Sequence, residues 1–344
     1  MSEWEKDPIM RSVLIAAAAV LVAGQAVAAE KVQWNYSMWG NPRAFTKGVE
    51  AAVDYIKEKS GGNFEITIHY GGTISPPKEN LDNVSLGALE AAHLCTFYHP
   101  GKNPVGTVLD LPFLPVENID QLIKVQDAFE SYEPWMKEMA GWHARPWFAG
   151  VLPTYEFMGV GNPPKKLEDW KGMRVRAGGG MGDAMRKLGA VPTTVPAPDV
   201  YQTVERGVVQ AASWPYSYAF GAYRLHEISK WYTEGMAIGS AHCPSVINID
   251  TYNALPDEYK QLLEEAKAVA YDAYRVVYKE AEDKWRPIFA SRMERVTYSP
   301  EQMAHFREIG AKPVWGDWVN EHKKEFDSQA VLDFVLDQAK QAKM

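Results

Sequence analysis

The sequence lacks an excess of basic residues. Its 344 residues include 36 Lys and Arg against 44 Asp and Glu, a formal net charge of −8, and charges of both signs are interspersed along the chain. Binding to nucleic acid depends on clustered Lys and Arg that neutralise phosphates. We therefore expect no nucleic acid partner.

Cysteine is also scarce, since Cys95 and Cys243 are the only two in the chain. A chain of this length with 46% hydrophobic residues can bury a sizeable core without a disulfide. In an oxidising compartment the two thiols could form one bond, and two buried free thiols are the alternative. The sequence leaves both alternatives open.

Signatures of enzymes and of nucleotide-binding loops are absent. The chain has no G-x-S-x-G and no H-E-x-x-H motif, and its 8 histidines follow no metal-ligand spacing. Gly178 and Gly180 begin like the dinucleotide-binding fingerprint, but Asp183 stands where the third glycine is required, and no Gly-Lys-Ser/Thr completes a phosphate-binding loop. We expect a protein that is not an enzyme and has no cofactor.

Long apolar runs are missing except near the N-terminus. Met10 and a basic residue precede the apolar residues 13–23, and the small residues 26–29 follow, which is the pattern of a secretory signal peptide. Residues 1–8 are acidic and suit a signal poorly, so Met10 is the expected true start. A membrane anchor is the alternative, but a span needs about 20 apolar residues. We predict a signal peptide over residues 1–29 and an exported, soluble mature chain.

The mature sequence begins with a strand-helix-strand pattern. Apolar residues alternate over 32–38 and again over 64–70, which is the period of a half-buried strand. Between them, apolar residues recur at helical spacing over 45–56, and Ser60-Gly61-Gly62-Asn63 ends that helix. This pattern predicts an α/β fold with a largely parallel sheet.

Two segments resemble each other, VSLGALEAA at 84–92 and VERGVVQAA at 204–212. Each is typical of a helix end, a closing glycine and a short strand. If each segment belongs to one of two lobes, the residues that follow, 93–98 and 213–216, lie at equivalent places. Ligands bind outside the carboxyl ends of strands in open α/β sheets, so we expect these residues to face each other across a cleft.

A long helix is predicted from Pro256 to about Arg292, because the segment has helical periodicity and no glycine to end it. At 1.5 Å per residue it exceeds about 50 Å, which is longer than one small lobe. We therefore expect it to brace both lobes.

Arg174 and Arg176 stand at alternating positions of a predicted strand over 173–177 and precede three glycines. The period of two places both side chains on one face, and one of them could lie at the end of the strand facing the cleft. A guanidinium offers a planar fork of donors that matches a carboxylate. A solvated ion pair at the surface is the alternative for either arginine.

Residues 30–340 resemble the extracytoplasmic solute-binding proteins of tripartite ATP-independent periplasmic (TRAP) transporters, the DctP-type family. The matching motifs are EDWKGMRVRAGGG at 168–180, LGAVP at 188–192, DVYQTVERGVVQ at 199–210, HEISKWY at 226–232 and IDTYNALP at 249–256. The resemblance implies an α/β, two-lobed periplasmic-binding-protein-like fold with a hinge and a long helix spanning both lobes. It also implies a periplasmic protein that closes on its ligand and delivers it to TRAP membrane subunits.

The resemblance also suggests site residues. The second arginine of the K-G-x-x-x-R element binds the ligand carboxylate in that family, and here it is Arg176, which leaves Arg174 a structural role. Further candidates are Thr96, Phe97 and Tyr98 on the first lobe's side, Trp39 at the end of the first strand, Trp214 after the second repeat, and His242 beside Cys243.

Two departures from the family bear on the ligand. Sialic-acid-binding members have an asparagine where this chain has Trp214, and a further arginine where it has Glu156. A second anionic group on the ligand is therefore not expected. Glu156 could meet a ligand amine or hydroxyl, help to hold a cation, or pair with a local lysine. The expected ligand is a small organic acid anion, a monocarboxylate with an apolar or aromatic remainder.

The predicted lobes are residues 30–153 plus 242–282 for lobe I and residues 154–241 plus 283–344 for lobe II. Alternatives that keep the fold are a sulfonate ligand or a 2-oxo acid held with a cation. A secreted enzyme acting on an organic acid and a ligand-sensing partner of a membrane receptor are alternatives of other classes. The sequence does not decide between monomer and dimer.

Overall fold

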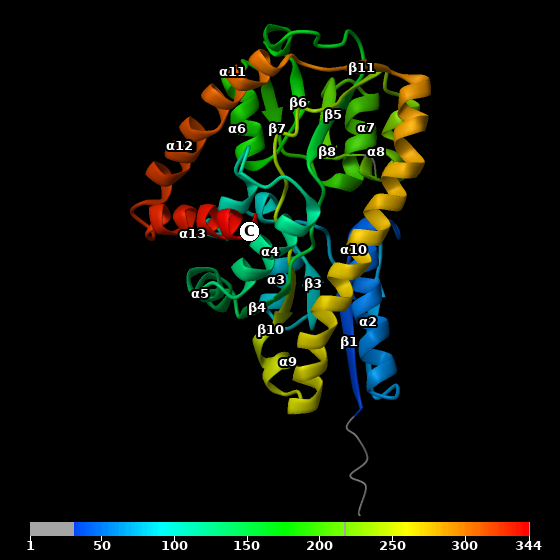
Figure 1. Ribbon diagram of the computed structural model, residues 1–344. Coiled ribbons are helices and arrows are strands. Elements are labelled where there is room, and N and C mark those ends of the chain that lie inside the picture. Colours follow the sequence, from blue (N-terminus) through cyan, green and yellow to red (C-terminus); the bar gives the residue numbers. More distant parts are fainter. Residues whose placement is uncertain (1–30, 217, 344) are drawn as a thin grey trace, which may run out of the picture.

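The computed structural model describes residues 31–216 and 218–343, which form two α/β lobes (Figure 1). The signal peptide predicted for residues 1–29 lies outside these residues. None of the described helices is long and apolar enough to cross a membrane.

The first lobe, in the lower half of Figure 1, contains a five-stranded sheet in the order β2-β1-β3-β10-β4. Its strands are β1 (Val32–Ser37), β2 (Phe64–His69), β3 (Ala91–His93), β4 (Ala144–Phe148) and β10 (Ser245–Asn248). β1 runs parallel to β2 and β3, whereas β10 runs antiparallel to β3 and β4. Helix α2 (Lys47–Lys59) connects β1 to β2, which confirms the predicted strand-helix-strand unit.

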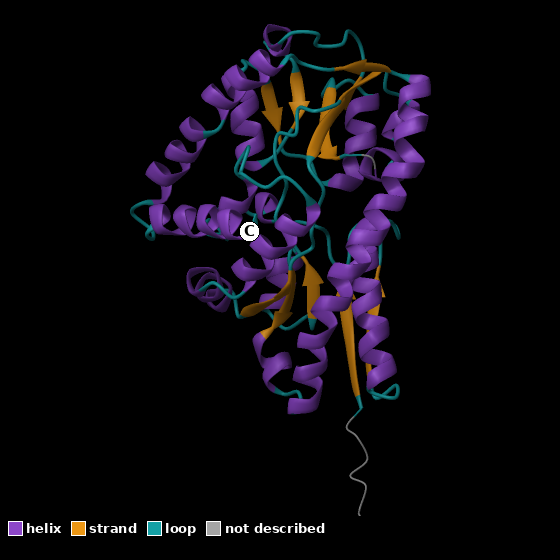
Figure 2. Ribbon diagram, in the orientation of Figure 1, coloured by secondary structure: helices purple, strands orange, loops and turns teal. Residues whose placement is uncertain are grey.

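The second lobe contains a six-stranded sheet in the order β11-β9-β5-β8-β6-β7. Its strands are β5 (Tyr155–Gly159), β6 (Arg174–Arg176), β7 (Val191–Thr193), β8 (Ala211–Pro215), β9 (Trp231–Thr233) and β11 (Glu294–Val296). β6 is parallel to β7 and β8, and β5 is antiparallel to β8 and β9. Helices lie beside both sheets (Figure 2).

The remaining elements are mostly short helices that connect these strands. They are η1 (Ala44–Thr46), α3 (Asn80–Ser85), η2 (Thr96–Tyr98), η3 (Gly106–Asp110), α4 (Ile119–Glu130), α5 (Glu133–Gly141), η4 (Leu167–Trp170), α6 (Gly179–Lys187), η5 (Ala197–Asp199), α7 (Val200–Glu205), α8 (Tyr218–Ala222), η6 (Leu225–Glu227) and α9 (Ile249–Asn253).

The internal repeat seen in the sequence has the same structure in both lobes. In the first lobe α3 is followed by Gly87 and then by β3, and in the second lobe α7 is followed by Gly207 and then by β8. Both glycines have a positive φ, 70° and 68°, a conformation that residues with a side chain adopt at a cost. The predicted helix-glycine-strand step is therefore confirmed twice.

The chain crosses between the lobes in two extended segments. Residues 149–154 lead from β4 to β5, and residues 234–244 lead back from β9 to β10. The segments are hydrogen-bonded to each other, since the amide of Gly150 donates to the carbonyl of Cys243 at 3.0 Å and the amide of Tyr155 donates to the carbonyl of Gly239 at 2.8 Å. Paired crossing segments are typical of hinges.

Helix α10 (Asp257–Arg292) is the predicted long helix, and it contacts elements of both lobes. It packs along α2 in the first lobe and against α8 in the second (Figure 1). Its 36 residues correspond to about 54 Å. The expected brace is therefore confirmed.

The C-terminal helices run from the second lobe back to the first. α11 (Pro300–Gly310) packs on α6, α12 (Lys312–His322) follows, and α13 (Ser328–Gln341) packs on α4. Trp318 of α12 donates to the Thr107 hydroxyl of the first lobe at 2.8 Å. We propose the predicted division into lobe I, residues 30–153 plus 242–282, and lobe II, residues 154–241 plus 283–344, with one change. The segment from about residue 312 onward belongs to lobe I.

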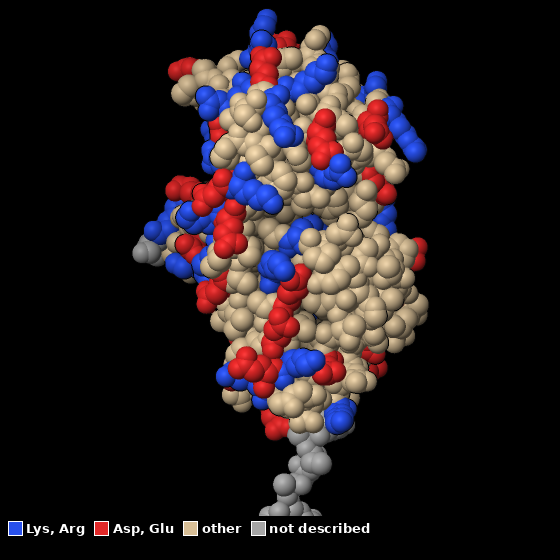
Figure 3. Space-filling view, turned by 90° about the vertical axis from the view of Figure 1, so that its right-hand side faces the viewer, with Lys and Arg blue, Asp and Glu red and all other residues tan. Residues whose placement is uncertain are grey.

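The charged side chains show no single-sign field on the face drawn in Figure 3, where Lys and Arg lie among Asp and Glu.

Candidate ligand-binding site

A small cavity lies between the lobes, where the residues after the two repeats meet. The first lobe contributes Trp39, Phe97 and Tyr98, and the second contributes Arg176 and Trp214. The cavity volume is about 20 Å³, room for about one water molecule. Five of the eight predicted site residues are thus brought together around one cavity.

Arg176 is the last residue of β6, and its guanidinium is held inside the cavity wall. The side chain is 1% exposed. Nε donates to the Val195 carbonyl at 2.9 Å and Nη1 to the Ser213 carbonyl at 2.7 Å. Nη2 is buried with no hydrogen-bond partner of normal geometry. Among the described residues no carboxylate forms an ion pair with this guanidinium, and the hydroxyls of Tyr98 and Tyr155 are near it, so its buried positive charge has only uncharged neighbours.

Aromatic rings flank this charge from both lobes. The guanidinium carbon lies 5.6 Å from the centre of the Phe97 ring and 5.8 Å from that of Trp214, within the range of cation–π attraction. The Tyr98 hydroxyl accepts a hydrogen bond from the Ala197 amide at 2.8 Å. Since Tyr98 belongs to the first lobe and Ala197 to the second, this bond holds the lobes together in the closed arrangement.

Arg174 has the structural role expected from the resemblance. It is exposed, and its Nε and Nη2 each donate at 2.9 Å to the carbonyls of Val208 and Gly207. It therefore braces the turn of the second repeat and has no contact with the cavity.

The glycines after β6 allow the two lobes to approach closely. A Cβ added at Gly178 would lie 2.4 Å from the Phe97 ring, and one added at Gly179, where φ is +55°, would lie 3.0 Å from Asp110. Any side chain here would push η2 and η3 of the first lobe away. The three glycines thus permit closure and are not a phosphate-binding loop.

Thr96 and His242, two predicted site residues, do not line the cavity but lie behind it. The Thr96 hydroxyl and the His242 amide both donate to Asp110, at 2.6 and 2.8 Å, and His242 Nε2 lies 2.7 Å from the carboxylate of Glu130. Burial raises the pKa of Asp110 to about 7. This network fixes the crossing segment beside η2.

Glu156 faces the crossing segment and does not line the cavity. Its carboxylate accepts hydrogen bonds from the Thr233 hydroxyl at 2.6 Å and from the amides of Gly235 and Ala237 at 2.9 Å each, with a longer one from Met236 at 3.3 Å. Burial raises the pKa of Glu156 to about 7. Its partners are the hinge backbone and Thr233, so neither a lysine nor the cavity is in contact with it.

Cys95 and Cys243 form a disulfide, which decides between the two alternatives that the sequence left open. The bond joins the start of η2 to the crossing segment, and both residues border the cavity. It therefore ties the wall that carries Phe97 and Tyr98 to the hinge.

Sequence reasoning missed a second arginine and three tyrosines in the cavity lining. Arg43 follows β1 in the loop before η1, and Tyr155, Tyr218 and Tyr223 come from the second lobe. The available signal was the position of Arg43, close to the carboxyl end of the first strand. The tyrosines carry no periodic signal that separates them from core residues.

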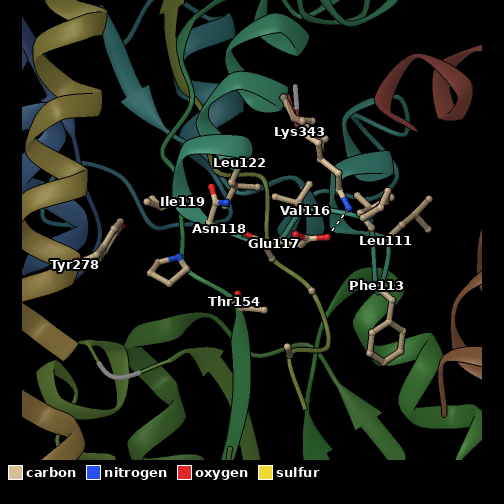
Figure 4. A pocket seen from close by; sticks show the side chains of 18 of the residues that line it. Leu111, Phe113, Val116, Glu117, Asn118, Ile119, Leu122, Thr154, Tyr278 and Lys343 are labelled. Atoms are coloured by element: carbon tan, nitrogen blue, oxygen red, sulfur yellow. Dashed lines mark hydrogen bonds and ion pairs between the residues drawn. The ribbon is translucent and has the colours of Figure 1, made fainter. Parts of the chain in front are cut away.

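A larger hollow, about 780 Å³, is lined in part by residues of both crossing segments (Figure 4). Thr154 and Tyr278 line it, and Lys343 forms an ion pair with Glu117 across it. Two more of its basic side chains are paired as well, Arg275 with Asp120 and Lys279 with Asp283. No buried polar atom of its described lining lacks a partner, in contrast to the lining of the small cavity.

Two lobes joined by paired crossing segments, with a cavity between them and a buried cation that has no acidic partner among the described residues, are the features of a protein that binds a small solute. The chain belongs to the DctP family of bacterial extracellular solute-binding proteins, family 7, which its residues 37–321 match. The resemblance noted from the sequence is confirmed. The family is one of solute-binding proteins, and the protein is not an enzyme.

Two curated relatives illustrate the range of the family. The chain is 24% identical over 301 residues to a monocarboxylate 2-oxoacid-binding periplasmic protein of Nostoc sp., covering 81% of this chain and 77% of the relative. It is also 24% identical over 257 residues to the C4-dicarboxylate-binding periplasmic protein of Rhodobacter capsulatus, covering 69% of this chain and 71% of the relative.

Solved structures share the fold. A TRAP solute-binding protein from Rhodoferax ferrireducens in complex with copurified benzoate has a TM-score of 0.82 and 17% identity, covering 91% of this chain and 99% of that chain. A marine metagenome TRAP protein specific for aromatic acid ligands, in complex with 3-hydroxybenzoate, has a TM-score of 0.80 and 18% identity, covering 92% of this chain and all of the other.

Proposed function

We propose that the protein is the periplasmic component of a TRAP transporter, which captures a small organic acid anion between its lobes and delivers it to the membrane subunits. The observation that carries this proposal is Arg176, a buried guanidinium with no acidic partner among the described residues. A buried unpaired charge is costly, and a ligand carboxylate would compensate it in bidentate or monodentate form.

The class of acid follows from the walls of the cavity. Phe97, Tyr98, Trp39 and Trp214 offer flat, largely apolar surfaces beside the cation. A monocarboxylate with an apolar or aromatic remainder suits this combination. Relatives named for monocarboxylates and aromatic acids support the same class.

The present cavity is too small for such an acid, because about 20 Å³ holds only about one water molecule. Ligand entry therefore requires the lobes to part about the crossing segments, and the aromatic walls must lie further apart in the bound state. Location in the periplasm is supported by the signal-like N-terminus and by the periplasmic relatives.

The experiment is a ligand screen of the mature protein, from Glu30 onward, by thermal shift. The panel contains mono- and dicarboxylates, aromatic acids, sugar acids and matched sulfonates. A ligand at 100 times its Kd adds about 2.7 kcal/mol to the free energy of unfolding, so a true ligand raises the melting temperature clearly.

The matched control is a pair of variants on the same strand. Arg176→Ala is expected to lose the shift for every acid, whereas Arg174→Ala, whose side chain is exposed, is expected to keep it. A carboxylate that shifts all three proteins equally would show that the anion binds elsewhere.

A further inference from the structure

A second guanidinium borders the cavity, and it also lacks an acidic partner. Arg43 is 8% exposed, and among the described residues no carboxylate forms an ion pair with it. Its Nη1 donates at 2.9 Å each to the carbonyls of Trp39 and Asn41, while its Nε is buried without a partner. The described cavity lining includes Arg43 and Arg176 but no Asp or Glu.

Arg43 lies in a different aromatic setting from Arg176. Its guanidinium carbon is 5.1 Å from the centre of the Phe45 ring and 5.5 Å from that of Tyr223. The Tyr223 ring stacks on Trp214 with centroids 4.8 Å apart, so the two cationic settings share one aromatic wall.

The Tyr223 hydroxyl is a third polar group without a partner at this cavity. It approaches the loop that carries Arg43 closely, because a Cβ added at Gly40 would lie 2.5 Å from its oxygen. Gly40 has a φ of +68°, a conformation suited to glycine. The local backbone thus leaves room for a hydroxyl that has no protein acceptor.

Two buried cations and a free hydroxyl require acceptors, because buried polar groups are almost always hydrogen-bonded and unpaired buried charges are costly. A single carboxylate on Arg176 leaves the donors of Arg43 and Tyr223 unused. The sequence argument against a second anionic group on the ligand depended on Glu156 standing where relatives have an arginine; Glu156 is bound to the hinge, and Arg43 supplies a second cation at the cavity.

We propose that Arg43 and Tyr223 form a second subsite, which binds an oxygen acceptor of the ligand other than the carboxylate held by Arg176. The ligand is then a flat acid that carries a further hydroxyl, carbonyl or carboxylate oxygen. Arg43 belongs to the first lobe and Arg176 to the second, so such a ligand connects the lobes and stabilises the closed form. This inference deepens the proposed function and depends on it.

The test uses three matched acids, benzoate, 3-hydroxybenzoate and benzene-1,3-dicarboxylate, and isothermal calorimetry. The wild-type mature protein is expected to bind at least one of the two acids with a second oxygen group about tenfold or more tightly than benzoate, since a hydrogen bond to a charged group is worth that much. Tighter binding of 3-hydroxybenzoate would identify a hydroxyl as the acceptor, and tighter binding of benzene-1,3-dicarboxylate would identify a carboxylate. Equal affinities for all three acids would overturn the proposal.

Variants separate the second subsite from the first. Arg43→Gln is expected to weaken the preferred acid by a larger factor than it weakens benzoate, and Tyr223→Phe, which removes only the hydroxyl, is expected to reduce the preference. If Arg43→Gln and Tyr223→Phe weaken benzoate and its substituted forms by the same factor, the subsite does not exist.

A second pair of variants tests the proposed function independently of the second subsite. Arg176→Gln is expected to weaken all three acids, and Arg174→Gln none of them. Wild-type protein that binds no acid, or Arg176→Gln protein that binds as tightly as the wild type, would contradict the proposed function itself. Unliganded melting temperatures of all variants show whether each one folds.

Discussion

The free energy of unfolding should depend on pH through Glu156, the carboxylate that accepts hydrogen bonds from the hinge backbone. The unfolded chain releases this proton near the ordinary pKa of 4.5, whereas burial raises the pKa of Glu156 in the folded protein to about 7. The folded state therefore binds more protons between these values, and the free energy of unfolding falls as the pH rises through this window. The difference of the two pKa values corresponds to about 3 kcal/mol.

Glu156→Gln removes this contribution because the amide does not titrate. Its oxygen can still accept from two amides, but its NH₂ group faces the Thr233 hydroxyl and the Met236 amide, which donate to the carboxylate. We expect the variant to be somewhat less stable than the wild type at pH 5. At pH 8 the wild type carries a buried charge. The free energy of unfolding of the variant, relative to that of the wild type, should therefore be about 3 kcal/mol higher at pH 8 than at pH 5.

The assay is urea unfolding of the ligand-free mature protein at pH 5 and pH 8. Asp110 and Glu138 also have pKa values raised to about 7 by burial, so only the difference between wild type and variant isolates Glu156. The exposed Glu168→Gln serves as the control, with no change expected. If the wild-type minus variant difference is the same at both pH values, the four donors hold the carboxylate ionised throughout and the reasoning is wrong.

Two further predictions concern closure and the disulfide. Gly178→Ala places a methyl group against the Phe97 ring and should lower the free energy of unfolding of the ligand-free protein by about 1–3 kcal/mol through overpacking, while Gly141→Ala, with nothing within 4 Å, should not; equal urea midpoints for the two variants would argue against the close approach of the lobes. Reduction of the Cys95–Cys243 bond, which closes 148 residues, should lower the free energy of unfolding by about 2–5 kcal/mol; unchanged urea midpoints with and without dithiothreitol would contradict this.

The fold was largely predictable because its signals are local. The alternation over 32–38 and 64–70 and the closing glycines of the two repeats correspond to β1, β2 and the steps into β3 and β8. The long helix was predictable from the helical periodicity of its sequence. The return of α13 to the first lobe was not, because it depends on long-range packing of Val331 and its neighbours in the first lobe's core.

The position of Arg176 at the end of β6, beside the cavity, was predictable because a motif fixes the backbone there. Glu156, also on a strand, was not predictable, since its direction depends on the crossing segment that donates to it. Arg43 belongs to an irregular loop with no period, and only the fold reveals that it borders the cavity. Thr96 was predicted to line the cavity because its neighbours in the sequence do, but its hydroxyl donates to Asp110 instead.

The central claim is that Arg176 binds the anion, and the most direct measurement is calorimetric titration of Arg176→Ala with the acid that the screen identifies. Truncating one partner of a buried charge pair costs about 2–5 kcal/mol, so the account predicts a loss of affinity of about 100-fold or more. Affinity within about threefold of the wild type, for a variant that melts like the wild type without ligand, would contradict the account.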